Sequence, residues 1–400
     1  MLDELWSGVA VSGAPSIERE FVLSHTAYVA FVFALPLLVA AVLEGGIALL
    51  SDLRGRRRLV AAGQAGLALS LAFTAWTHSA WGLALGLALA GTTSGVACGA
   101  AQALLVAQDP RGTDRAMVRW TFFGAVGDLL TPLVTAGAIA LGFTYRGASL
   151  AVAGIVGAQC VGSLLAGGAD PDRAPSPDDD PPADPLRAAL ARALRNPRLW
   201  AWLFAAASCT LLDELVVALA TLRLQREEGV REALAVAASV TFAAGAVAGT
   251  LATDALVERF GGRRVLVVSA ASCVLALGVG VEVHQAVASS IALFVIGVTC
   301  SPHHALAQAR AYDELPANPG TVQAIAQLFT AVDIGAPLAL GAIADRYGLR
   351  AAIGALALQP VIVATCALAL GATAARRPGR SSKDPPTPSP GPGSTARSSR

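Results

Sequence analysis

The sequence predicts an all-α membrane protein made of two similar halves, each with six transmembrane helices. Three observations predict this fold class. Of the 400 residues, 54% are hydrophobic and only 14% are charged, whereas a typical soluble protein carries about 25% charged residues. Eleven apolar segments are long enough to cross a bilayer, since each span needs about 20 residues. Several short motifs also recur at a nearly constant offset along the chain.

The composition excludes several classes of protein. A net charge of +1 does not favour a nucleic-acid-binding protein, which normally carries an excess of basic residues. High hydrophobicity with low net charge excludes a disordered chain. The six cysteines lie in apolar stretches without any CxxC pair, so neither a zinc site nor a disulfide framework is predicted. HExxH and GxSxG patterns are absent from the sequence. We therefore expect no enzyme activity, metal or cofactor.

The predicted spans are rich in Ala, Leu, Val and Gly, and their small residues allow helices to approach closely in lipid. Connections between spans separate into two alternating sets by their basic residues, 22 against 7. The positive-inside rule places the first set and the C-terminus in the cytoplasm, as in a multi-pass protein of the plasma (inner) membrane. The spans are residues 25–51, 59–78, 81–107, 116–141, 148–168, 199–221, 232–256, 265–283, 286–308, 321–344 and 351–373.

Internal repeats divide the chain into two parallel halves. Asp128-Leu-Leu-Thr-Pro132 matches Asp333-Ile-Gly-Ala-Pro337, and four other short matches occur in the same order in both halves, with offsets of 204 to 210. Ordered matches at nearly one offset indicate two parallel halves. The predicted units are residues 1–168, a cytoplasmic linker 169–198, residues 199–373, and a disordered cytoplasmic tail 374–400 rich in Pro, Ser and Arg.

The repeat also makes a prediction about the N-terminus. Leu-Asp-Glu-Leu occurs at residues 2–5 and again at 212–215, where about a dozen apolar residues precede it. Only Met1 precedes the first copy. We therefore expect twelve spans, the first of them incomplete because the start codon was assigned too late. The alternative is a surface segment with a chance match.

The loop between the second and third spans reads Ala48-Leu-Leu-Ser-Asp52-Leu-Arg-Gly55-Arg56-Arg57-Arg58-Leu59. It resembles the signature loop of the major facilitator superfamily, Gly-x-Leu-Ala-Asp-Arg-x-Gly-Arg-Arg-x-x-Leu, with departures that include its first and sixth positions. The resemblance implies the fold of that family, with two six-helix bundles. It also implies a secondary transporter that moves a small molecule by alternating access.

A looser copy of the loop occurs in the second half, at residues 258–264. The resemblance implies that residues of both loops hold the halves together in one of the alternating states. Anchoring of basic residues at the inner leaflet is the simpler alternative. The candidate residues are Asp52, Gly55, Arg56, Arg57, Glu258, Arg259, Gly262 and Arg263.

Ionisable residues inside the spans are the candidates for substrate binding and proton coupling, because a buried charge is costly unless it is paired or hydrated. Asp128 and Asp333 occupy equivalent positions, each four residues before a proline. For this symmetric pair, a structural role beside a proline-broken helix is the alternative. The resemblance implies that spans one, four, seven and ten line a central cavity. The other candidates are Asp3, Glu4, Asp213, Glu214, Glu44, His303 and His304.

Carboxylates in a low-dielectric cavity can exchange protons near neutral pH, so proton coupling is expected. Their excess over basic residues inside the spans predicts a cationic or neutral cargo, or protons alone. The segment 124–132 has glycines typical of exporters but lacks their Gly-Pro junction. Efflux and uptake both stay open, as does a non-transporting sensor with a transporter fold. The expected partners are a small-molecule substrate, protons and membrane lipid, without nucleic acid, and we expect a monomer.

Overall fold

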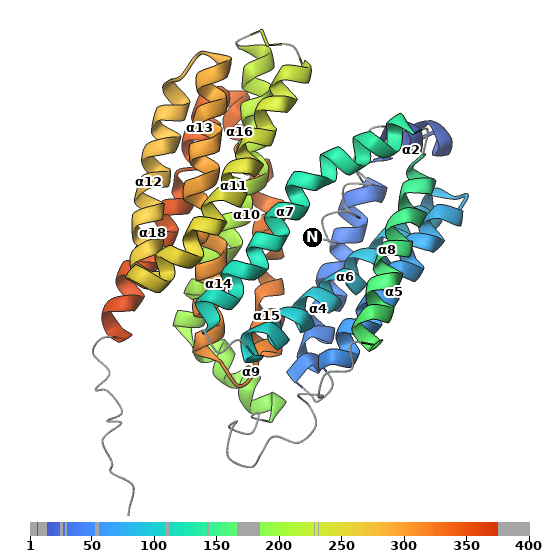
Figure 1. The fold of residues 1–400 in the computed structure, drawn as a ribbon, viewed down its shortest axis with the longest axis horizontal. Coiled ribbons are helices and arrows are strands. Elements are labelled where there is room, and N and C mark those ends of the chain that lie inside the picture. The colour runs from blue at the N-terminus through green and yellow to red at the C-terminus, as the bar shows by residue number, and fades with distance from the viewer. Residues whose placement is uncertain are drawn as a thin grey trace, which may run out of the picture.

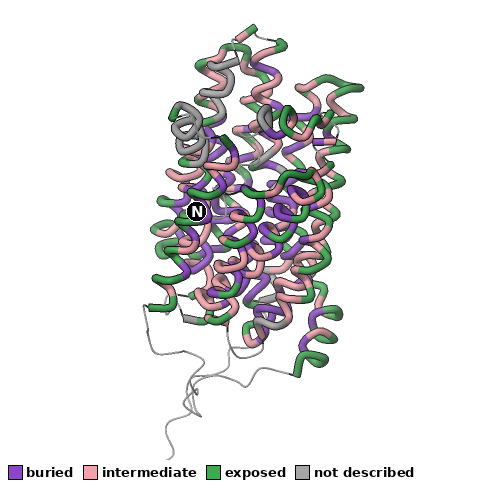
Figure 2. Tube along the Cα trace, turned by 90° about the vertical axis from the view of Figure 1, so that its right-hand side faces the viewer, coloured by how far each residue is buried: buried purple, intermediate pink, exposed green. Residues whose placement is uncertain are grey.

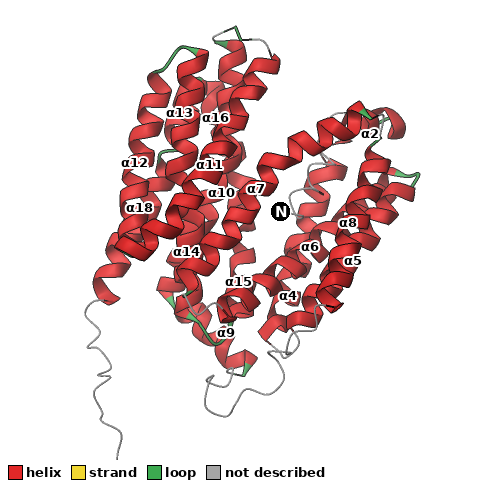
Figure 3. Cartoon of the chain, viewed as in Figure 1, coloured by secondary structure: helices red, strands yellow, loops and turns green. Residues whose placement is uncertain are grey.

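The structure is a computed structural model, and all the regular structure in its described residues is helical (Figure 3). This confirms the predicted all-helical fold class. Asp3, Glu4 and Gly55 lie outside the described residues, as does the predicted incomplete first span apart from Trp6. The described residues are 6, 14–24, 27–28, 30–52, 56–108, 112–141, 144–165, 185–227, 229–230 and 232–374.

The first group of helices forms a bundle in which α4, α5, α6 and α8 pack side by side. Its members are α2 (Ala14–Phe21), the π-helix η1 (Ala30–Ala34), α4 (Leu35–Ala48), the 3₁₀ helix η2 (Leu49–Asp52), α5 (Arg56–Trp76), α6 (Ala80–Gln108), α7 (Thr113–Ala140) and α8 (Tyr145–Leu165).

The second group follows a short connecting helix, α9 (Leu186–Arg195). Within this group α10 packs against α14 and α18, and α11 packs against α13. Its members are α10 (Pro197–Arg226), α11 (Glu232–Phe260), α12 (Gly262–Glu282), α13 (Ala286–Cys300), α14 (Pro302–Glu314), α15 (Pro319–Ala326), the 3₁₀ helix η3 (Gln327–Phe329), α16 (Thr330–Tyr347), α17 (Leu349–Ala355) and α18 (Leu358–Ala374).

The two groups meet at one end of the molecule and diverge at the other (Figure 1). We call these the α9 end, where α9 lies, and the open end. Helix α7 packs against α11 and α14 of the second group and runs toward α2 at the open end (Figure 1). The molecule therefore has the shape of a V, and α7 crosses from the second group to the first group at the open end (Figure 1).

The outer surface of both groups is apolar. Figure 2 shows buried residues toward the interior and exposed residues along the outside, and these exposed positions include Leu69 at 72%, Leu275 at 71% and Ile291 at 61%. Helices satisfy their own backbone hydrogen bonds, so apolar helices can lie in hydrocarbon. Within the described residues, nine helical stretches are long and apolar enough to cross a membrane. These features are those of a multi-pass membrane protein.

Close packing of α11 against α13 depends on two glycines. A Cβ atom added at Gly245 would lie 2.2 Å from the carbonyl oxygen of Phe294, and one added at Gly297 would lie 2.3 Å from that of Phe242. Real Cβ atoms do not come so close to backbone, so only glycine fits at this crossing.

We expect Gly245→Ala to lower the thermal stability of the purified protein, because the added methyl group meets backbone that cannot move aside. Overpacking of this kind costs about 1–3 kcal/mol. Gly278 is the matched control, since a Cβ atom there meets nothing within 4 Å. Gly278→Ala should be neutral or stabilising by up to about 1 kcal/mol, through helix propensity. Equal melting temperatures for the two variants in detergent would contradict the packing argument.

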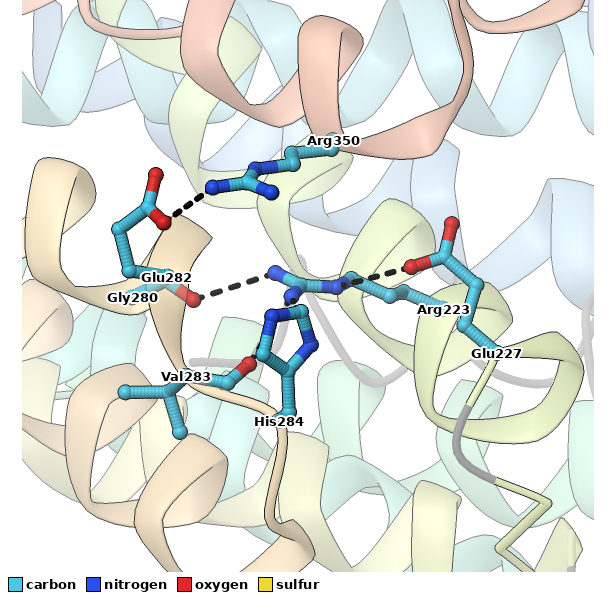
Figure 4. A network of polar contacts seen from close by, with 7 residues as sticks. All are labelled: Arg223, Glu227, Gly280, Glu282, Val283, His284 and Arg350. Atoms are coloured by element: carbon cyan, nitrogen blue, oxygen red, sulfur yellow. Dashed lines mark hydrogen bonds and ion pairs between the residues drawn. The ribbon is translucent and has the colours of Figure 1, made fainter.

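At the open end, Arg223 closes the C-terminus of α12 (Figure 4). Its guanidinium group donates to the carbonyl oxygens of Gly280 at 3.2 Å and Val283 at 2.9 Å. The last carbonyl groups of a helix have no partner within the helix, and a cation there is also favoured by the helix dipole. Beside this network, Arg350 of α17 pairs with Glu282 of α12 (Figure 4).

The first group closes the corresponding helix end with an arginine from a different helix. Arg146 of α8 donates to the carbonyl oxygens of Ala75 and Thr77, at the end of α5, and forms an ion pair with Glu20 of α2. The hydrogen bond from Arg146 holds the pKa of the Glu20 carboxyl below its usual value. The carbonyl groups at equivalent helix ends are therefore satisfied in both groups by an arginine, which belongs to α10 in the second group and to α8 in the first.

Candidate functional site

A cavity of about 630 Å³ lies between the two groups of helices. Its walls are formed by α7 from the first group and by α10, α11, α13 and α14 from the second. Among the candidates from the sequence, the structure brings Asp128, Asp213 and His304 together in this lining. Each group of helices thus supplies one carboxylate to the cavity.

The α7 wall consists of one face of the helix. Trp120, Thr121, Gly124 and Asp128 line the cavity, and their spacing places them on adjacent turns of the same face. Pro132 cannot donate a hydrogen bond to the carbonyl group of Asp128, because it has no N–H group. Trp120 and Thr121 were not predicted as site residues, although the helical spacing counted back from Asp128 points to them.

A break between α13 and α14 shapes the opposite wall. Pro302 lacks the N–H group that would donate to the carbonyl group of Val298. The hydroxyl group of Ser301 donates to that carbonyl oxygen instead, at 3.2 Å. Cys300 and Ser301 just before the break and His304 just after it all line the cavity. Cys300 and Ser301 were also not predicted.

The remaining candidates lie elsewhere. His303 is fully buried, with its Nδ1 atom 3.3 Å from the side-chain amide of Gln359 on α18, so it belongs to the packing of the second group. The Glu44 carboxylate accepts a hydrogen bond of 2.8 Å from Gln327. Asp333 lies on α16 and is not among the described residues that line the cavity. Asp3 and Glu4, and the side chain of Glu214, lie outside the description.

No group of three or more His, Cys, Asp or Glu side chains in the described residues is placed to hold a metal ion. All six cysteines are free thiols. The described residues of the cavity lining offer hydrogen-bonding groups and charge from two carboxylates and an imidazole.

Asp52 connects the two groups at the α9 end. Its carboxylate accepts hydrogen bonds from the N–H groups of Gly320 and Thr321, both at 2.7 Å, and from the Thr321 hydroxyl at 2.5 Å. These groups form the N-terminus of α15, where a negative charge is favoured. Burial raises the pKa of the Asp52 carboxyl, and the three donors offset part of that rise. This contact joins η2 of the first group to α15 of the second.

Ion pairs close the α9 end further. Arg115 at the start of α7 forms a two-point contact with Asp254 of α11, with both N···O distances at 2.7 Å. Arg310 of α14 contacts Asp114 at 2.5 Å. Glu258, a residue of the second signature loop, lies 3.3 Å from Arg115 but is mostly exposed, so it adds little by itself.

Three arginines of the signature loops make contacts within their own group. Arg57 donates to the carbonyl oxygen of Ser163 near the end of α8, and Arg263 donates to that of Ala367 on α18 at 2.9 Å. Arg259 lies over the ring of Phe260. Gly262 faces the first group, because a Cβ atom there would lie 2.3 Å from the Asp114 carboxylate.

The chain matches the family model of the Major Facilitator Superfamily over residues 5–339. The chain belongs to the major facilitator superfamily. Membership places it among membrane transporters rather than enzymes and agrees with the resemblance of the signature loop. Among curated proteins, none matches the sequence of this transporter.

Solved structures of the superfamily share the fold. A variant of the E. coli fucose:proton symporter FucP matches with a TM-score of 0.71 and 16% identity, over 92% of this chain and 97% of that one. FucP in the outward conformation matches with a TM-score of 0.62, 17% identity and the same coverage. The human organic anion transporter MFSD10 (TETRAN) matches with a TM-score of 0.60 and 14% identity, again over 92% and 97%.

Proposed function

We propose that this protein is a secondary active transporter that moves a small solute by alternating access and couples that movement to protons. The observation that carries the proposal is the cavity between the two groups, with Asp128 from one group and Asp213 from the other in its walls. A site at the boundary of two bundles is exposed to either side as the bundles rock against each other.

Asp128 and Asp213 are the proposed proton carriers. A carboxylate in a cavity of low dielectric constant is costly in its charged form. It can therefore gain a proton from one aqueous side and lose it to the other as the cavity changes sides. His304 in the same lining has a ring that can donate and accept hydrogen bonds beside these carboxylates.

The α9 end is the proposed cytoplasmic end, because the arginine-rich connections of the chain lie there. The structure then represents a state closed to the cytoplasm, in the plasma (inner) membrane, with the C-terminus inside. The fold match to FucP in its outward conformation supports this proposal. Residues 1–168 and 199–373 are the proposed moving units, with 169–198 as the linker between them.

The proposed cargo is a cationic or neutral small solute. The described residues of the lining include two carboxylates and no Lys or Arg, so an anion would meet repulsion without a partner. Trp120 and Phe242 in the same lining offer aromatic surface to a sugar ring or an organic cation. The match to a fucose:proton symporter supports uptake of a neutral solute.

The test is transport by the purified full-length protein in proteoliposomes with an imposed proton gradient. Radiolabelled fucose serves as a neutral probe, tetraphenylphosphonium as a cationic probe and benzoate as an anionic probe. We expect accumulation or proton-driven expulsion of a neutral or cationic probe, lost when a protonophore is added. Transport of benzoate alone would contradict the proposed cargo. Binding without transport of any probe would favour a sensor.

A further inference from the structure

Three buried thiols lie on or near the part of α10 that carries Asp213. Cys209 lies one turn before it on α10, Cys273 belongs to α12, and Cys300 ends α13. All three are buried, with exposed fractions of 5% or less, and Cys273 and Cys300 belong to the same buried cluster as Leu212, the neighbour of Asp213 on α10. A carboxylate with thiols as its neighbours is unusual, because a thiol is a much weaker hydrogen-bond donor than a hydroxyl or an amide.

Only one of these thiols is seen to donate to the carboxylate. The Cys300 Sγ atom lies 3.6 Å from Asp213 Oδ1. The Cys209 thiol has other hydrogen-bond partners. It donates to the Ala205 carbonyl oxygen at 3.1 Å and accepts from the Gln359 side chain at 3.2 Å. Cys300 also has a second acceptor, the carbonyl oxygen of Gly297 at 3.5 Å. Its thiol can therefore turn from Asp213 to its own helix.

We propose that Cys300 is a positioning residue, whose thiol donates a hydrogen bond to the ionised Asp213 carboxylate and returns to the Gly297 carbonyl when Asp213 takes up a proton. This inference rests on the proposed function, in which Asp213 carries a proton. Cys300 and Asp213 line the same cavity. Cys300 also lies at the end of α13, directly before the break between α13 and α14. A change in its hydrogen bond to Asp213 therefore occurs where that wall of the cavity bends.

Other ionisable groups share the cavity with Asp213 or belong to a helix that packs against α10. Asp128 and His304 share the cavity lining from α7 and α14. Asp333 belongs to α16, which also packs against α10. Substitution of Cys300 leaves all of these groups in place, so a change in the pH dependence of transport can be assigned to the loss or gain of one donor.

The first experiment compares the pH dependence of transport for Cys300→Ser and Cys300→Ala in proteoliposomes. A hydroxyl donates more strongly than a thiol and stabilises the ionised carboxylate, so Cys300→Ser should move the pH midpoint down by about half a unit. Cys300→Ala removes the donor and should move the midpoint up by a similar amount. Cys366→Ser is the matched control, since Cys366 is not among the described residues of the cavity lining and donates to the Ala201 carbonyl. Unmoved midpoints, or shifts in the opposite order, would overturn the proposal.

The second experiment does not need transport. The S–H stretching band of the full-length protein in lipid is recorded by infrared spectroscopy, with Cys300→Ser identifying the contribution of Cys300. Asp213→Asn should shift that contribution, because the charged acceptor is gone. An unshifted band would overturn the hydrogen bond. If the wild-type protein shows no proton-driven transport, the proposed function fails, while this band still decides whether the thiol donates to Asp213.

Discussion

Asp213→Asn is expected to abolish proton-driven transport while leaving a folded protein in the membrane. Asparagine has the shape of the aspartate side chain but cannot ionise, so it fills the same space in the cavity wall without carrying a proton. We expect accumulation of the solute against a gradient to fall at least about tenfold, which corresponds to about 1.4 kcal/mol. Exchange of solute at equal concentrations should persist, because it needs no net proton movement.

The same change at Asp128 tests whether the first group takes part equally. Asp128→Asn should also reduce accumulation, since the carboxylate lines the same cavity from α7. Asp313→Asn is the control, because that carboxylate is exposed and pairs with Arg310 outside the cavity. Accumulation unchanged in both cavity variants would remove these carboxylates from the coupling mechanism. Loss in the Asp313 variant as well would indicate a general effect on folding.

Asp52→Ala is expected to open the α9 end. The change removes three hydrogen bonds to the N-terminus of α15, and a hydrogen bond to a charged group contributes about 1.5–3 kcal/mol. Part of this is returned by water, so we expect a shift of about 3 kcal/mol, or about 100-fold, away from the closed state. Hydrogen–deuterium exchange of α15, and of α6 and α14, should accelerate.

Two further variants sharpen the test of the Asp52 contact. Thr321→Val removes one donor and should shift the equilibrium in the same direction by a smaller amount. Glu258→Gln is the control, because that carboxylate is 67% exposed and an exposed ion pair contributes little. Faster exchange confined to residues 320–321, without any change in α6 or α14, would show that the contact does not hold the groups together.

Much of the molecule could be predicted from the sequence, because every segment that crosses the bilayer must meet the same requirements for length and apolar character. The predicted spans 59–78 and 265–283 correspond closely to α5 and α12, since an apolar stretch of about 20 residues has few alternatives to a membrane-spanning helix. The signature loop predicted the family, which the match over residues 5–339 confirms. Asp52 was singled out as a residue that holds the halves together, and its carboxylate contacts the N-terminus of α15.

The candidate site was predicted only in part. Composition and span position singled out Asp128, Asp213 and His304, because an ionisable side chain inside a span is costly unless it is paired or hydrated. The same reasoning singled out His303, one residue from His304, and the structure buries it against Gln359. One residue along a helix turns a side chain by about 100°, so burial in packing and exposure to a cavity differ by one position.

The sequence by itself determined the helical fold, the family and the list of ionisable residues inside the spans, whose burial in lipid is costly. These follow from properties of segments, namely length, hydropathy and local motif, which act before any helix meets another. Only the tertiary structure decided which residues meet, placing Asp128 of one group opposite Asp213 of the other and a thiol beside Asp213. Such contacts join positions far apart in the chain, and they depend on how tilted and broken helices pack.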